Sequence, residues 1–266
     1  MKQSTKFFDR DILRQVLNLT AILAAFGVNV LANIAPFNGL TIGEISNTVF
    51  RNVLITPANY AFVIWGLIYL GLITLGVYQV LPAQRQNPSL RQMGYLLVLA
   101  SLAQILWVFF FQYRIFTLSL VAMLAILLPL MAIYVRLQIG LRRASRAENW
   151  FVRIPLSIYL AWISVATIVN VATTLYSLRW SGWSINPEVW TAIALIAGAA
   201  IAATISIQRA DIAFVLVIVW AFVAIAVRQA SIPVIAVTAG GLAIALIVLL
   251  VSGVLRSRNS RSHSHD

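Results

Sequence analysis

The chain has 266 residues, of which 61% are hydrophobic and only 10% are charged, and its mean hydropathy is +0.92. Because soluble domains carry about 25% charged residues, this composition predicts an integral membrane protein. The chain has no cysteine, and its two histidines, His263 and His265, lie in a polar tail. This excludes disulfides, histidine-ligated haem, copper oxidase sites and Ser-His-Asp hydrolase chemistry within the membrane, and we expect no cofactor.

Apolar runs follow one another along the chain, and most are long enough to cross a bilayer, which takes about 20 residues. The first run is too long for a signal peptide and has no Ala-x-Ala cleavage site at its end, so we interpret it as an uncleaved helix. The fold class we predict is an all-α integral membrane protein, a polytopic bundle of about eight transmembrane helices. The runs lie at roughly 16–37, 59–81, 92–113, 115–139, 154–177, 189–208, 211–228 and 233–255.

The basic residues indicate how this bundle is oriented. If the N-terminus is cytoplasmic, only Arg51, Arg114, Arg179 and Arg228 of the 19 basic residues fall on the outer side. A missed or added helix would scramble this division, so we predict eight spans with both termini cytoplasmic. We expect the membrane to be a bacterial cytoplasmic membrane or a thylakoid. The net charge of +12 then reflects topology, and we expect no nucleic acid partner.

Two connections have unusual sequences. The 38–57 segment is long and mixes glycines, polar residues and aliphatic residues. We consider two interpretations for it, a lid over the outer mouth of the bundle and an ordinary exposed loop. The Arg142–Arg153 loop is rich in arginine and contains Trp150, which predicts an anchor for anionic lipid.

No span carries an ionisable residue at its middle, which argues against ion-coupled transport. Neutral amides remain within the spans, at Asn29, Asn33, Gln104 and Asn170. An unpaired amide in hydrocarbon costs several kcal/mol, so each must bond to another helix or to a bound molecule. Both alternatives stay open for each of these side chains.

Aromatic residues are arranged on one side of the second predicted helix. At about 100° per residue, Phe62, Trp65 and Tyr69 share a stripe about 60° wide. Such a stripe is typical either of close helix packing through glycines or of a wall that faces a ligand. The glycines concerned are Gly66, Gly71 and Gly76.

Two other predicted helices carry similar groups. On the fifth, Tyr159 and Asn170 lie within about 20° of each other, with Trp162 about 60° away. On the third, Gln104 and Trp107 are one turn apart. Flat apolar molecules with small polar edges bind in sites built from indole, phenol and amide groups. We therefore predict a ligand-binding site formed by Asn59, Phe62, Trp65, Tyr69, Gln104, Trp107, Tyr159, Trp162 and Asn170.

These residues resemble the motifs of the TspO/translocator protein family, the tryptophan-rich sensory proteins. The family has a proline turn followed by Trp and Tyr four apart, then an amide and a Trp, and later Tyr, Trp and Asn. Here Gln104 stands where the family usually has Asn, and Asn59-Tyr60 stands where it commonly has a ligand-contacting Trp. The matching residues are Pro57, Trp65 and Tyr69, then Gln104 and Trp107, then Tyr159, Trp162 and Asn170.

The resemblance covers roughly residues 16–180. It implies a five-helix bundle that binds porphyrins, sterol-like molecules or other flat hydrophobic ligands beneath the loop joining its first two helices, and homodimers in many members. The last three helices have no counterpart in the short members. We therefore divide the chain into a TspO-like five-helix core, 1–180, and a three-helix membrane extension with a basic polar tail, 181–266.

The function we expect is that of a membrane receptor or carrier for a porphyrin-like or sterol-like ligand, with a sensory or regulatory role. The alternative is a transporter permease or a structural membrane subunit of a larger complex, because the last three helices have small-residue spacings that suit helix association. The sequence shows no paired carboxylates, metal cluster, nucleophile–base pair or phosphate loop, so we expect neither an enzyme nor a metal site.

Overall fold

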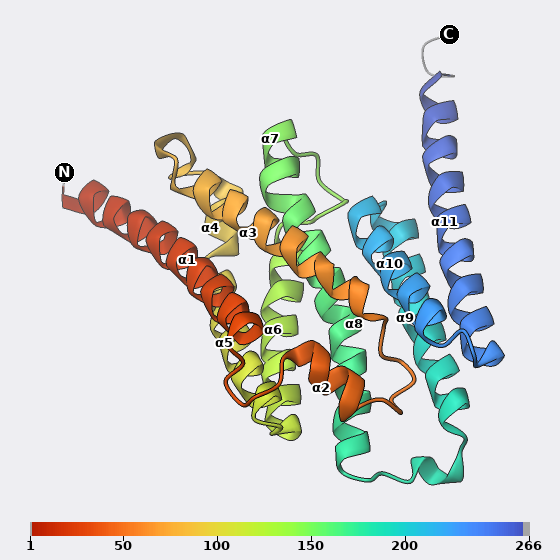
Figure 1. Cartoon of the computed structure of the whole chain (residues 1–266). Helices are drawn as coiled ribbons and strands as arrows, with labels where there is room; N and C mark the ends of the chain where they lie inside the picture. The colour runs from red at the N-terminus through yellow and green to blue at the C-terminus, as the bar shows by residue number, and fades with distance from the viewer. Residues whose placement is uncertain (1, 263–266) are drawn as a thin grey trace.

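The computed structural model describes residues 2–262, and this part of the chain forms helices and connecting loops without a strand (Figure 1). The long helices are α1 (Lys2–Ile34), α3 (Ile64–Val80), α5 (Leu96–Gln112), α6 (Phe116–Arg136), α8 (Ile154–Ser177), α9 (Pro187–Arg209), α10 (Ile212–Arg228) and α11 (Pro233–Ser262). The short elements are α2 (Ile42–Thr48), α4 (Pro88–Met93), α7 (Arg146–Glu148), the 3-10 turns η1 (Asn59–Val63), η2 (Pro82–Gln84) and η4 (Gly182–Ser184), and the π-helical turn η3 (Asn149–Arg153).

Each predicted apolar run corresponds to one long helix, and the predicted all-α polytopic membrane fold is confirmed. Among the described residues, six helical segments are long and apolar enough to cross a membrane. The other two apolar helices, α5 and α10, have 17 residues each. At about 1.5 Å per residue they span about 25 Å, close to the thickness of a hydrocarbon core of about 30 Å.

The helix boundaries that differ most from the predicted ones are those of the third run and the first. The 92–113 run contains a break, because α4 ends before Gly94, whose φ of +59° is a conformation that other residues rarely adopt. The first helix begins at Lys2 rather than near residue 16. Its polar first turns are held by an ionic cluster, in which the buried Asp11 carboxylate accepts a hydrogen bond of 2.8 Å from Arg14 and pairs with Arg91 of α4.

The helices α1, α3, α8, α6 and α5 form a closed ring in which each contacts the next and α5 returns to α1. The other long helices, α9, α10 and α11, contact one another, and α10 also packs against α8 and η1. The division of the chain at residue 180 stays a prediction, since α10 is attached directly to the ring. Figure 1 shows α7 and the beginning of α1 at one end of the bundle, the α7 end, and α2 and the α8–α9 connection at the other, the α2 end.

Two of the three glycines in the second predicted helix allow close helix contact. A Cβ at Gly76 would lie 2.8 Å from Leu19 Cδ1 of α1, and one at Gly71 would lie 3.1 Å from Pro155 Cβ of α8. A Cβ at Gly66 would meet no atom within 4 Å. Helix packing through glycine therefore accounts for the second half of α3, toward the α7 end, and not for its aromatic beginning.

Candidate functional site

Five of the predicted site residues, from η1, α3, α5 and α8, line one hollow inside the ring. Its volume is about 50 Å³, and its roof is formed by Ile42 and Ser46 of α2, which covers the ring at the α2 end. Trp107 and Trp162 are buried, with exposed fractions of 6% and 2%. The five residues are Phe62, Trp65, Trp107, Trp162 and Asn170.

The aromatic rings of this hollow contact one another across helices. Phe62 meets Trp162 edge to face at a centroid distance of 6.1 Å, which joins η1 to α8. Trp65 stacks on Tyr69 at 5.7 Å and meets Tyr159 at 6.3 Å. Tyr69 and Tyr159 thus contact the Trp65 ring and do not line the hollow. Such aromatic pairs add about 0.5–1.5 kcal/mol each beyond the area they bury.

Asn170 joins three helices through its amide. Its Oδ1 accepts a hydrogen bond of 2.8 Å from Trp107 Nε1 of α5, and its Nδ2 donates to Ser119 Oγ of α6 at 3.0 Å. Of the two alternatives left open for this residue, interhelical bonding is the one that the structure contains. Gln104 differs, because its side chain is 1% exposed and neither amide atom has a hydrogen-bond partner among the described residues.

A second, more polar space adjoins the hollow toward the α2 end. Its volume is about 300 Å³, and Ile42, Phe62 and Trp65 line both spaces. Amides dominate the rest of its wall, so the two spaces together form a polar entrance above an aromatic interior. The polar residues of this entrance are Asn29, Asn33, Thr41, Glu44, Asn47 and Asn59.

The roof helix α2 has a well-defined beginning. Thr41 Oγ1 accepts a hydrogen bond from the Glu44 amide at 3.2 Å, and the Thr41 amide donates to Glu44 Oε2 at 2.7 Å, which together form a capping box. The hydrogen bond from the Thr41 backbone holds the pKa of the Glu44 carboxyl below its usual range. Ile45 and Phe50 are fully buried and attach the segment to the ring.

The roof segment is also bound by α10, which the sequence did not indicate. Arg228 at the end of α10 donates to Asn47 Oδ1 at 3.0 Å and to the carbonyls of Ser46 and Pro57 at 3.2 Å. Gln229 donates to the Leu54 carbonyl at 2.9 Å. The 38–57 segment is therefore fastened at several points, and the sequence could only place Arg228 at a helix end.

A much larger space lies outside the ring, in a groove between α3, α8 and α10. Its volume is about 1080 Å³, and none of the nine predicted site residues lines it. Part of the predicted lipid anchor does, since Arg142, Arg143, Trp150 and Arg153 border this groove at the α7 end. The sequence predicted this arginine-rich loop, but it could not indicate that the loop lies beside α10.

A closed ring of apolar helices with an aromatic hollow beneath its first loop defines a polytopic helical membrane protein with an internal candidate ligand site. The chain matches the model of the family described as TSPO-like protein over residues 15–252, and it belongs to this family. The predicted family relationship is confirmed, and the match extends beyond residue 180 through α9, α10 and most of α11. No curated protein and no solved structure matches the chain.

Proposed function

We propose that this protein is a membrane receptor or carrier that binds a flat hydrophobic ligand, porphyrin-like or sterol-like, in the hollow beneath α2. The observation that supports this proposal is the convergence of Phe62, Trp65, Trp107 and Trp162 on one space inside the ring. Helices packed only for stability have no need to leave a space between their aromatic side chains. Stacked indoles provide large apolar faces of the kind that a planar ligand requires.

The volumes imply that the roof moves when the ligand binds. Sites for small molecules usually measure about 300–1,000 Å³, and the hollow alone has about 50 Å³. The entrance adds about 300 Å³. Because Ile42 lies in the wall of both spaces, displacing α2 joins them into one site of the usual size.

The side chains around the two spaces suit binding better than catalysis. The amides of Asn29, Asn33 and Asn59 can hydrogen-bond the polar edge of a ligand whose ring lies against Trp65. Glu44 is the one ionisable side chain in the described lining of the hollow and the entrance, and it serves the capping box. General acid–base catalysis requires a titratable side chain that is positioned to exchange a proton with the substrate, and the Glu44 carboxylate is instead bonded to Thr41.

The test is a titration of the detergent-solubilised full chain with protoporphyrin, followed by the absorbance of the porphyrin, because the variants remove tryptophan. In the Trp65→Ala, Trp162→Ala double variant we expect affinity to fall at least about tenfold, since two ring contacts are lost. The control is Trp183→Ala, because Trp183 is 71% exposed at the α2 end and lies outside both spaces. Undiminished binding in the double variant contradicts the proposal.

A further inference from the structure

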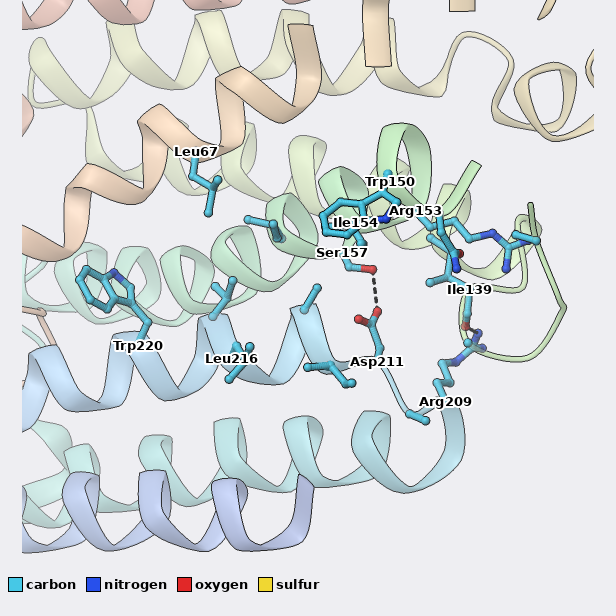
Figure 2. A pocket seen from close by; sticks show the side chains of 18 of the residues that line it. Leu67, Ile139, Trp150, Arg153, Ile154, Ser157, Arg209, Asp211, Leu216 and Trp220 are labelled. Carbon is cyan, nitrogen blue, oxygen red and sulfur yellow. Dashed lines mark hydrogen bonds between the residues drawn. The ribbon is translucent and has the colours of Figure 1, made fainter. Parts of the chain in front are cut away.

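The groove between α3, α8 and α10 has two chemically different halves. Its long walls are apolar and include Val63, Leu67 and Leu216. Figure 2 shows Leu67 of α3 across the groove from Leu216 of α10. Several of these side chains are exposed and so can contact an occupant of the groove, with 73% for Val63, 52% for Leu67 and 50% for Leu216. Its α7 end is lined by arginines, namely Arg142, Arg143, Arg153 and Arg209.

Most of the arginine charge at this end is not neutralised by the protein. Arg153 pairs with Glu148 at 2.9 Å. Arg209 donates to the Ile139 carbonyl at 3.0 Å and lies over the Tyr134 ring at 5.0 Å. Among the side chains that the structure describes (residues 10–253 and 255), no carboxylate lies within ion-pair distance of Arg142, Arg143 or Arg209. This mouth therefore attracts an anion.

The one carboxylate in the described lining of the groove accepts hydrogen bonds from neighbouring protein groups. Asp211 Oδ2 accepts hydrogen bonds from Ser157 Oγ at 2.6 Å, drawn in Figure 2, and from the Tyr134 hydroxyl at 2.8 Å. Its Oδ1 accepts from the Phe214 amide at 3.1 Å and caps α10. The residue is 8% exposed, and its single negative charge stands against the four arginines of the groove lining, so the α7 end keeps a positive charge.

The far end of the groove is bounded by Trp220. Its indole Nε1 donates to the Ala61 carbonyl of η1 at 3.2 Å, and its ring meets Tyr60 edge to face at 5.2 Å. Asp211 and Trp220 are nine positions apart on α10, a distance of about 13 Å along the helix. Half of a hydrocarbon core is about 15 Å thick, so the groove covers the depth of one leaflet.

We propose that this groove is a specific binding site for one anionic glycerophospholipid. An acyl chain lies between α3 and α10, and the headgroup phosphate contacts Arg142, Arg143 and Arg209 at the α7 end. The exposed indole of Trp150 lies at the same mouth, where tryptophan favours the interface between headgroups and chains. The site is separate from the hollow beneath α2, and no residue lines both.

The test is native mass spectrometry of the detergent-solubilised full chain with added phosphatidylglycerol or phosphatidylcholine of the same chains. We expect one phosphatidylglycerol to remain bound per chain at saturation and phosphatidylcholine to bind at least about tenfold more weakly. In Arg142→Gln, Arg143→Gln the dissociation constant for phosphatidylglycerol rises about thirtyfold, because two charge contacts are lost. The matched control is Arg136→Gln, Arg146→Gln, which removes two exposed arginines from the same end but outside the groove.

A second variant tests the apolar half. Leu216→Trp fills the groove from a half-exposed position and leaves all arginines in place, so the bound lipid is lost while the unfolding temperature is retained. Equal loss of lipid in the control pair shows a diffuse attraction between charged surfaces and overturns the proposal. Equal binding of both lipids, or unchanged lipid binding in Leu216→Trp, overturns it as well.

Discussion

At the scale of single residues, Gly140 shows how closely two connections approach each other at the α7 end. Its φ is +81°, and a Cβ there would lie 2.1 Å from the Arg209 carbonyl oxygen. Gly140→Ala therefore requires a strained backbone and a shift of the α9–α10 turn. We expect it to lower the stability of the detergent-solubilised protein by about 2 kcal/mol or more, measured as a fall in unfolding temperature.

Gly39 provides the control for this prediction. Its φ of +79° is almost the same, but a Cβ there would meet no atom within 4 Å. Gly39→Ala should cost only the left-handed conformation, about 1 kcal/mol. If both variants lose the same stability, the close approach of Gly140 to Arg209 has no energetic weight.

Asn170 and Gln104 are two buried amides with opposite environments. Asn170→Leu leaves the Trp107 indole N–H without its acceptor, and we expect a loss of about 1 kcal/mol in the free energy of unfolding. Gln104→Leu removes an amide that has no partner in the described structure and should leave stability unchanged or raise it. The comparison is made by thermal unfolding in detergent. A larger loss for Gln104→Leu shows that this amide has a partner in the protein.

At the scale of elements, α10 and the roof segment act together. Arg228→Gln removes hydrogen bonds to Ser46, Asn47 and Pro57, so we expect α2 to open more often. The chain has no cysteine, and Ser46→Cys introduces a single thiol into α2, at a position that is 5% exposed and lines the hollow. Its labelling by a water-soluble maleimide should become at least about tenfold faster in the Arg228→Gln background, since bonds to a charged group are lost.

The control for this experiment is Arg51→Gln, which removes an exposed arginine from the same segment. Its labelling rate should equal that of the Ser46→Cys protein. Equal rates in the Arg228→Gln and Arg51→Gln backgrounds mean that α10 does not hold the roof closed.

At the scale of the whole molecule, the sequence was sufficient for the helices and for part of the site. Long apolar runs and their punctuation predicted all eight long helices, because the bilayer permits few other backbone arrangements. Helical periodicity and the family motifs placed five residues in one predicted site, and these five line one hollow in the structure: Phe62, Trp65, Trp107, Trp162 and Asn170. Periodicity reports which residues share a face of one helix, and the family motifs indicated which of these faces belong to the same site.

Features that depend on how distant helices meet could not be predicted in this way. Leu67 and Leu216 line a groove, yet an apolar residue facing a groove and one facing lipid tails look the same in sequence. In the sequence, Arg228 indicates only membrane topology. In the structure it binds the 38–57 segment, which is more than 170 positions away. Whether an amide such as Asn170 joins helices or faces a ligand also depends on its neighbours in space.

The position of α10 has a mechanical consequence. Its first half borders the groove with Leu216 and Trp220. Its last two turns hold the end of the roof segment and the residue after it, because Arg228 donates to the Pro57 carbonyl and the Ala224 carbonyl accepts from the Ala58 amide. A tilt of α10 at the groove therefore also displaces its end at the 38–57 segment. A ligand in the hollow and a lipid in the groove would be thermodynamically linked through such a tilt, each altering the affinity of the other by the same factor.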